Sequence, residues 1–504
     1  MACSMLRPAF LAPLLLLCAG LAWSAPEPLR IGSKRFTESY ILAQLLAQTA
    51  QRHAPVEVQA GLGNTAIVYA ALRNGSIDLY PEYAGTIDQE ILKNDRPSSL
   101  AAMRAQLQPL GLGVDIALGF NDGYALAMRA ERARQLGIAK LSDLAHHPTL
   151  KLGLSNEFIG RSDGWGGLAR RYGLPQRPTG LDHGLAYDAV AGGQVDVIDI
   201  YSTDAKIDHL GLKVLEDDAA YFPRYDALLL YRLDVPQRHP AAWAALQGLA
   251  GRIDERAMIA MNAQAELQGR SFEAIARDFL AGRQEPGPSA SSSTGGGFAA
   301  KLFGADLARL TRQHLTLVLA SVGLAALLGI PLATWVAPHA GPRGLVLGAC
   351  GTLQTVPSLA LLAALISLVD RIGALPALLA LTLYALLPIM RNTCVGLAEV
   401  PGGLKLAGQA LGLNAGQRLR LIELPLALPT ILAGVRTAAS IAVGTATIAA
   451  FIGAGGYGER IVTGLALNDH QLLLAGALPA AALALLIEGL FALLERHLRR
   501  RAGR

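Results

Sequence analysis

The pattern of hydrophobic and polar positions divides the chain into two unlike parts. Up to about Gly282, short apolar runs alternate with amphipathic stretches, whereas long apolar runs dominate from Leu315 onward. In the first part, this alternation predicts strands at 29–32, 56–60, 77–80, 150–154 and 195–200, and helices at 38–52, 65–74, 164–172 and 184–192.

Strands that alternate with helices predict parallel sheets joined by crossover helices. Because the series occurs twice in succession, we expect two α/β lobes with a cleft between them. The first lobe should comprise about 28–118 and 221–282, and the second about 119–220. The chain then crosses twice between the lobes, an arrangement suited to hinge closure on a solute.

Composition supports a soluble part followed by a membrane part. Of 504 residues, 52% are hydrophobic and only 16% are charged. Five apolar runs approach or exceed the roughly 18–20 residues that a bilayer crossing needs. These predicted spans are Leu315–Ala337, Leu345–Val369, Ala374–Met390, Thr437–Ala454 and Leu472–Leu494.

A segment of Pro, Ser and Gly at 284–297 predicts a flexible linker between the soluble domain, 25–283, and the transmembrane domain, 298–504. Its reach is on the order of 20 Å, which keeps the soluble domain near the membrane.

Basic residues predict the orientation in the membrane. With five spans, the basic residues of the second half fall on one side of the membrane. The positive-inside bias identifies that side as the cytoplasm. These basic residues are Arg343, Arg391, Lys405, Arg418, Arg420 and the C-terminal arginines. The connection 391–436 is then cytoplasmic and the soluble domain is periplasmic, outside the inner membrane. A signal peptide at 1–24 predicts the same side, with a lipid-modified Cys18 as the alternative to cleavage.

Other function classes find no support. The net charge of +5 forms no basic stripe with interleaved aromatics, so we expect no nucleic-acid partner. The cysteines lie at 3, 18, 350 and 394, so the soluble half has no disulfide framework. The sequence contains no nucleophile–base arrangement, no metal-ligand cluster and no nucleotide-binding loop. We therefore expect a non-enzymatic protein without a cofactor or metal.

The connection between the third and fourth spans carries a specific motif. It reads AGQALG at 407–412, then nine residues, then IELP at 422–425. A polar, basic, glycine-hinged helical hairpin of this kind can dock into another protein's groove, although an ordinary amphipathic loop helix is the alternative.

The same segment resembles the coupling loop of ABC importer permeases. That resemblance implies a separate cytoplasmic ATPase, a homodimer of the permease half surrounded by lipid, and a set of ATPase-coupling residues. These residues are Ala407, Gly408, Gly412, Ile422, Leu424 and Pro425. The family pattern opens with Glu-Ala-Ala, whereas this chain has Leu406-Ala407-Gly408, which puts one ion pair with the ATPase in doubt.

The soluble half resembles the glycine betaine/carnitine/choline-binding proteins of osmoprotectant uptake systems. The matching segments are GSKRFTE at 32–38, YPEYAGT at 80–86, GFNDGY at 119–124, GRSDG at 160–164, DIYSTDA at 199–205 and FPRYD at 222–226. The resemblance implies a type II periplasmic-binding-protein fold with a two-crossover hinge, followed by an all-α permease domain.

The chemistry of these segments fits a quaternary ammonium. Such a group has no N–H to donate, so aromatic faces hold it, each worth about 0.5–2 kcal/mol. By resemblance, Tyr83, Tyr124, Tyr201 and Tyr225 form the cage, and Asp122 adds a carbonyl or negative potential.

The resemblance also implies a clamp for the solute's carboxylate. Arg161 offers a bidentate fork, and Lys34 and the Thr86 hydroxyl complete the clamp. Arg35, beside Lys34, is the alternative cation at that place.

The sequence therefore predicts an ABC importer subunit that captures and translocates glycine betaine. Choline, carnitine, proline betaine or another trimethylammonium acid such as ergothioneine are alternative solutes. A solute sensor that does not transport is a further alternative, against which the coupling loop argues. An exported enzyme with a membrane anchor is a third, but five spans exceed what an anchor needs.

Overall fold

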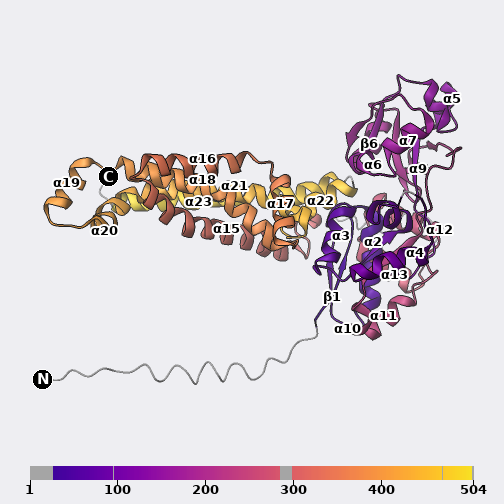
Figure 1. The fold of residues 1–504 in the computed structure, drawn as a ribbon, viewed down its shortest axis with the longest axis horizontal. Coiled ribbons are helices and arrows are strands. Elements are labelled where there is room, and N and C mark those ends of the chain that lie inside the picture. The colour runs from indigo at the N-terminus through magenta and orange to yellow at the C-terminus, as the bar shows by residue number, and fades with distance from the viewer. Residues whose placement is uncertain (1–26, 95, 284–297, 468, 502–504) are drawn as a thin grey trace.

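The computed structural model describes residues 27–94, 96–283, 298–467 and 469–501. The predicted signal peptide at 1–24 and the linker at 284–297 lie outside the described residues. Figure 1 shows an α/β part at one end of a bundle of long helices.

The α/β part contains two five-stranded mixed sheets, one in each lobe. The first sheet has the order β2 (Val56–Gln59), β1 (Leu29–Gly32), β3 (Leu79–Tyr83), β10 (Ala227–Arg232) and β4 (Leu112–Asp115). The second has the order β7 (Thr179–Leu181), β6 (Leu152–Ser155), β8 (Val197–Tyr201), β5 (Tyr124–Arg129) and β9 (Leu212–Val214). The predicted fold class, with two crossings between lobes, is confirmed.

One strand in each sheet departs from the all-parallel arrangement that we expected. β10 runs antiparallel to β3 and β4, and β5 runs antiparallel to β8 and β9. Each of these two strands comes directly after a crossing from the other lobe, so it enters its sheet from the hinge end. Hydrophobic periodicity carries no information on strand direction.

Helices cover both sheets. In the first lobe they include α2 (Thr37–Ala50), α3 (Thr65–Arg73), α4 (Leu100–Leu107), α11 (Pro240–Gln247), α12 (Glu255–Glu266) and α13 (Phe272–Leu280). In the second they include α5 (Ala130–Leu136), α6 (Asn156–Gly160), α7 (Trp165–Tyr172), α8 (His183–Ala191) and α9 (Lys206–His209). Side-chain oxygens of Asn64, Ser155, Asp182 and Asp254 cap the starts of α3, α6, α8 and α12.

The second half is a helix bundle. Within the described residues, four helices are long and apolar enough to cross a membrane, at Leu307–Val336, Ala374–Glu399, Ala415–Ala446 and His470–Leu494. They correspond to α15 (Leu307–Val336), α18 (Ala374–Glu399), α21 (Leu424–Ala446) with the short segments before it, and α23 (His470–Arg501). A fifth span results if α16 (Ala340–Thr355) and α17 (Ser358–Val369) count as one.

Two predicted spans need correction. The second, at 345–369, is bent by 104° between α16 and α17, where Pro357 precedes the first residue of α17. The fourth, predicted at 437–454, lies earlier, because the run from Leu424 is apolar enough to join the helix and Pro425 fits its first turn. With α18 continuing to Glu399, the connection shrinks from 391–436 to about 400–423.

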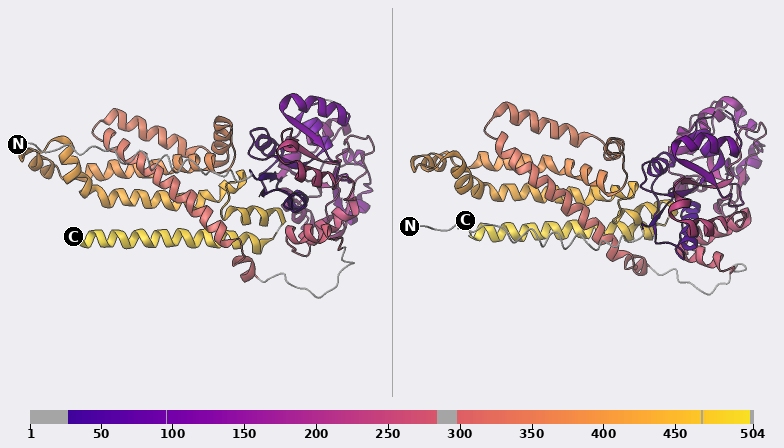
Figure 2. Two further views of the ribbon diagram at one scale, coloured as in Figure 1. Left: turned by 90° about the horizontal axis from the view of Figure 1, so that it is seen from below. Right: turned by 60° about the horizontal axis from the view of Figure 1, so that its bottom comes forward.

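The two ends of the bundle carry different elements. α19 (Gly402–Ala410) and α20 (Ala415–Arg418) lie at the end far from the α/β part, while α17 and α22 (Gly458–Leu467) lie at the near end (Figure 1). Figure 2 shows the same separation from two other sides. The motif at 407–425 is therefore remote from the lobes.

Both lobes touch the membrane half. Ile372, between α17 and α18, joins the hydrophobic core of the first lobe that contains Leu62 and Val68. α8 of the second lobe contacts α22. The cleft between the lobes consequently faces the bundle.

Candidate functional site: an aromatic cage between the lobes

The four tyrosines singled out in the sequence converge between the lobes. Tyr83 ends β3, Tyr124 begins β5, Tyr201 ends β8, and Tyr225 lies two residues before β10. Tyr124 and Tyr201 are directly paired across the β5–β8 ladder, and Tyr83 pairs with Ala227 in β10. The strand pairing thus brings the rings to facing edges of the two sheets.

The rings pack as one cluster. The Tyr124 ring centroid lies 5.1 Å from that of Tyr201 and 5.7 Å from that of Tyr225. Phe36, which sequence reasoning missed, links the two sides, with centroids 5.2 Å from Tyr201 and 6.3 Å from Tyr83. The only sequence signal for Phe36 was its position two residues after Lys34.

A single small cavity joins most of the predicted site residues. Its lining includes Lys34, Tyr83, Thr86, Asp122, Tyr124, Tyr201 and Tyr225, together with Phe36 and Glu157. Its volume is about 20 Å³, room for roughly one water molecule. A trimethylammonium group therefore needs the lobes to part or a side chain to move.

Lys34, and not Arg35, faces the cage. Its Nζ lies 2.6 Å from Glu82 Oε1 and 4.8 Å from the centroid of the Tyr83 ring. The ammonium thus already sits over an aromatic face, which is the interaction expected for a solute's cationic head. Arg35 points toward Phe451 of the membrane half.

Arg161 stands at the edge of the cage. Its Nη2 donates to Thr86 Oγ1 at 3.2 Å, and its guanidinium lies 5.1 Å from the Tyr124 centroid. Its fork is bidentate to Asp163, at 2.7 and 2.6 Å, and the Tyr225 hydroxyl also donates to Asp163. Both cations of the expected clamp are therefore paired with protein carboxylates.

His183 supports the cage from behind. Its ring centroid lies 4.3 Å from that of Tyr201, and its Nε2 lies 3.2 Å from Asp204 Oδ2. Burial lowers the pKa of His183, but Asp199 and Asp204 outweigh burial and raise the pKa to about 10. A charged His183 thus holds Tyr201 in place at neutral pH.

A second cavity, of about 390 Å³, connects the cleft to the membrane half. It shares Lys34, Phe36, Glu157 and Tyr201 with the cage, and we call it the vestibule. Its other wall consists of Phe451, Val462 and Leu465, all from the membrane half.

Arg35 bridges the mouth of the vestibule. Its guanidinium carbon lies 4.8 Å from the Phe451 ring centroid, and its Nη2 lies 4.0 Å from Asp182 of the second lobe. One side chain of the first lobe thus touches both the second lobe and the membrane half.

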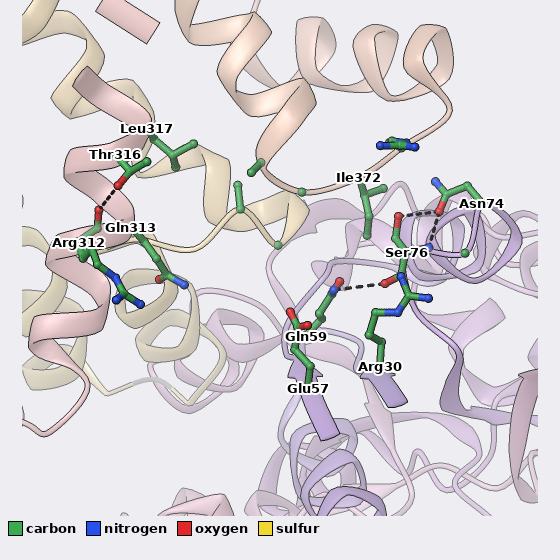
Figure 3. Close-up of a pocket in the computed structure, with 16 residues that line it drawn as sticks. Arg30, Glu57, Gln59, Asn74, Ser76, Arg312, Gln313, Thr316, Leu317 and Ile372 are labelled. Carbon is green, nitrogen blue, oxygen red and sulfur yellow. Dashed lines mark hydrogen bonds between the residues drawn. The ribbon is translucent and has the colours of Figure 1, made fainter. Parts of the chain in front are cut away.

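A larger cavity, of about 670 Å³, lies between the first lobe and the bundle. Figure 3 shows Arg30 and Gln59 on one side of it and Arg312, Gln313 and Thr316 of α15 on the other. Among the described residues that line it, none is aromatic. It therefore lacks the aromatic faces that a quaternary ammonium needs. The candidate site is the cavity of about 20 Å³ within the tyrosine cage.

The six predicted coupling residues lie together at the far end of the bundle. Ala407 and Gly408 belong to α19, Gly412 turns with φ of +81°, and Ile422, Leu424 and Pro425 lead into α21. Glu423 pairs with Arg418 at 2.9 Å and with Lys405 at 3.7 Å.

Comparison with known proteins assigns both halves. Residues 27–282 match the substrate-binding domain of ABC-type glycine betaine transport systems. The chain belongs to that family. Residues 325–500 match the inner-membrane component of binding-protein-dependent transport systems. The predicted resemblance is confirmed: a binding domain and a permease domain of this importer class are fused in one membrane protein, and the permease family implies a partner ATPase and a small solute.

Three relatives illustrate the likeness. A glycine-betaine-binding protein of Pseudomonas aeruginosa is 35% identical over 53% of this chain and 92% of its own length. An osmoprotectant import permease protein of Salmonella typhimurium is 45% identical over 36% of this chain and 87% of its own. An ergothioneine transport permease/ergothioneine binding protein of Helicobacter pylori is 32% identical over 53% of this chain. The match spans about half of that last relative, 51% of its length.

Proposed function

We propose that the binding domain of this importer captures a quaternary-ammonium solute, glycine betaine first among the candidates, and hands it to its own permease half. The observation that carries the proposal is the cage of Tyr83, Tyr124, Tyr201 and Tyr225, closed by Phe36. Several aromatic faces around one point are the main way to hold a cation without N–H groups. A separate cytoplasmic ATPase supplies the energy.

The proposed arrangement places the binding domain, about 25–283, in the periplasm and the permease half, 298–504, in the inner membrane. The opposite placement of the lobes and of α19 and α20 along the bundle supports it. Two copies of the permease half would form the translocation pathway, and α19 with α20 would dock on the ATPase.

Selectivity among solutes rests on Arg161, Lys34 and Thr86. Since Asp163 and Glu82 already neutralise the two cations, a solute carboxylate has to compete with them. Choline, which has no carboxylate, is therefore the second candidate. Carnitine, proline betaine and ergothioneine remain alternatives, the last because of the name of the Helicobacter pylori relative.

The test is calorimetric titration of the detergent-solubilised full chain with glycine betaine and with choline. We expect Tyr201→Ala to weaken both solutes by more than about tenfold, equal to about 1.4 kcal/mol, because both lose an aromatic face. Arg161→Ala should weaken glycine betaine by a similar factor and choline by less, because only the first has a carboxylate.

Tyr69→Ala and Arg224→Ala are matched controls, since both side chains lie outside the cage. Loss of choline binding without loss of glycine betaine binding in Arg161→Ala contradicts the clamp. If neither solute binds, glycine betaine and choline are both excluded as the captured solute.

A further inference from the structure

Two buried carboxyl groups meet at one hydroxyl beside the cage. Glu38 belongs to α2 of the first lobe, Asp122 to the segment that crosses between the lobes, and Thr203 follows β8 of the second lobe. Thr203 Oγ1 lies 2.5 Å from Glu38 Oε2 and 2.9 Å from Asp122 Oδ1. All three residues are at most 4% exposed.

The Thr203 hydroxyl has one hydrogen, so it can donate to only one of these two acceptors. Glu38 accepts from the Tyr83 hydroxyl at 2.5 Å and from Asn262 Nδ2 at 3.3 Å, in addition to Thr203. The Asp122 Oδ1 atom otherwise accepts only the peptide N–H of Thr203, at 3.3 Å. The contacts are satisfied when Asp122 is a carboxylic acid that donates to Thr203, which in turn donates to an ionised Glu38.

The electrostatic surroundings favour one retained proton. Burial raises the pKa of Glu38 to about 7. Burial and the Glu38 and Asp204 carboxyls hold the pKa of Asp122 well above its usual range. Burial is the larger cause in both cases, because it penalises the charged form.

The described cations around the cage already have carboxylate partners. Lys34 pairs with Glu82, and Arg161 with Asp163 and Glu157. His183 lies between Asp204 and Asp199, and Lys206 offsets part of the Glu266 charge. A second negative charge on the pair thus has no counter-ion of its own within the described residues.

We propose that Glu38 and Asp122 together are the counter-charge for the solute's cationic head, and that the pair releases its shared proton when that head binds. The connection to the cage is direct: Asp122 lines it, and Tyr83 joins its ring to the cage and its hydroxyl to Glu38. One cationic head arrives and one proton leaves to solvent, so the pair and the head together keep the net charge of minus one that the singly protonated pair has alone. The inference rests on the proposed substrate class and adds Glu38 to the residues that select for it.

The experiment is calorimetric titration of the full chain with glycine betaine and with choline, in two buffers that differ in ionisation enthalpy. Each buffer is used at several values between about pH 6 and about pH 8. We expect the binding heat to depend on the buffer, which reports proton release. As the pH rises, the dissociation constant should fall by up to about tenfold per pH unit until the unliganded pair has lost its shared proton, and should stay constant at higher pH.

Asp122→Asn should weaken binding and remove most of the buffer dependence, because the amide has no proton to release and only one carboxyl is left to face the solute's cationic head. Asp115→Asn, on an exposed residue of β4, is the matched control and should behave as wild type. Thr203→Val removes the hydroxyl that joins the two carboxyl groups and leaves both carboxyls in place. Thermal melting checks that each variant is folded.

The outcomes separate the two proposals. Saturable binding by the wild-type chain with equal heats in both buffers overturns the proton exchange and leaves the proposed function in place. Absence of binding by both solutes excludes glycine betaine and choline as the captured solute and overturns this inference with them. Buffer-dependent heats that persist unchanged in Asp122→Asn overturn the assignment to this pair.

Discussion

At the scale of single residues, cationic side chains of the protein itself lie over two rings of the cage. Lys34 lies over Tyr83, and Arg161 lies over Tyr124. Each of these cations has a carboxylate partner within 2.6 Å. The same ring faces that attract these side chains would attract a solute cation, so a cationic solute would have to displace Lys34 and Arg161 from these faces.

His183 provides a residue-scale prediction on stability. Its pKa of about 10 lies above the ordinary value of 6.5, so the charged form is favoured in the folded chain. The stabilisation is complete below about pH 6.5 and is lost as the pH rises through about 10. We expect the melting temperature of His183→Gln to lie below that of wild type near pH 6, and the difference to shrink toward pH 10.

Differential scanning fluorimetry of both chains across this range is the measurement. His209→Gln is the control, since His209 lies on α9 and its variant should track wild type at every pH. A difference between wild type and His183→Gln that stays constant with pH would contradict a charged imidazole.

At the scale of elements, Gly408 fixes how α19 packs on the segment that follows it. A Cβ at this position would lie 2.6 Å from Ile422 Cδ1, so the end of the Ile422 side chain would have to shift, and the larger Val side chain would also approach Leu413 and Arg418. We expect Gly408→Val to push α19 away from 419–423 and to reduce the amount of ATPase that co-purifies with the chain by at least about fivefold.

Gly403→Val is the matched control, because it lies on the same helix and a Cβ there would meet no neighbouring atom within 4 Å. Quantitative mass spectrometry of the purified complex gives the ratio of the two subunits. Equal ATPase recovery from both variants would show that the α19 packing does not support docking.

The sequence sufficed to predict elements whose signal is local. Tyr124 and Tyr201 could be placed near each other because strand ends converge at a sheet edge, and α15 and α23 could be found because their apolar runs are long. Features that depend on tertiary contacts could not be predicted from the sequence. Lys34 and Arg35 are adjacent, and only their distant partners, Glu82 for Lys34 and Phe451 for Arg35, show which of them faces the cage.

The bounds of the fourth span also could not be predicted correctly from the sequence. The predicted connection of 391–436 included 424–436, whereas Pro425 fits an initial helical turn and Pro429 is tolerated inside α21. Phe36 and the Glu38–Thr203 contact were missed because residues far apart in the chain form them. Tyr201, which contacts Phe36, and Thr203, which contacts Glu38, lie in the other lobe, and no local pattern reveals such contacts.

At the scale of the whole molecule, the vestibule joins the cage to the permease half. Phe451 and α22 form the outer wall of this space, and both lobes rest on the bundle through Ile372 and α8. Because both halves belong to one chain, the effective concentration of the binding domain at the permease half is high, at about millimolar. Docking contacts can therefore be few and weak, so that the lobes remain free to open.

This arrangement predicts that Phe451→Ala loosens docking without altering the cage. The ring stacks on Arg35, which also reaches Asp182 at the start of α8. Its loss should increase deuterium uptake at 183–191 and 458–465, while the dissociation constant for the captured solute stays within about twofold of wild type. Hydrogen exchange with mass spectrometry on the full chain measures the first effect, and titration the second.

Phe303→Ala is the control, because Phe303 is 73% exposed and lies outside the vestibule. Unchanged uptake at 183–191 in Phe451→Ala would mean that the lobes are held by other contacts, and a weakened dissociation constant would place Phe451 within the solute site itself.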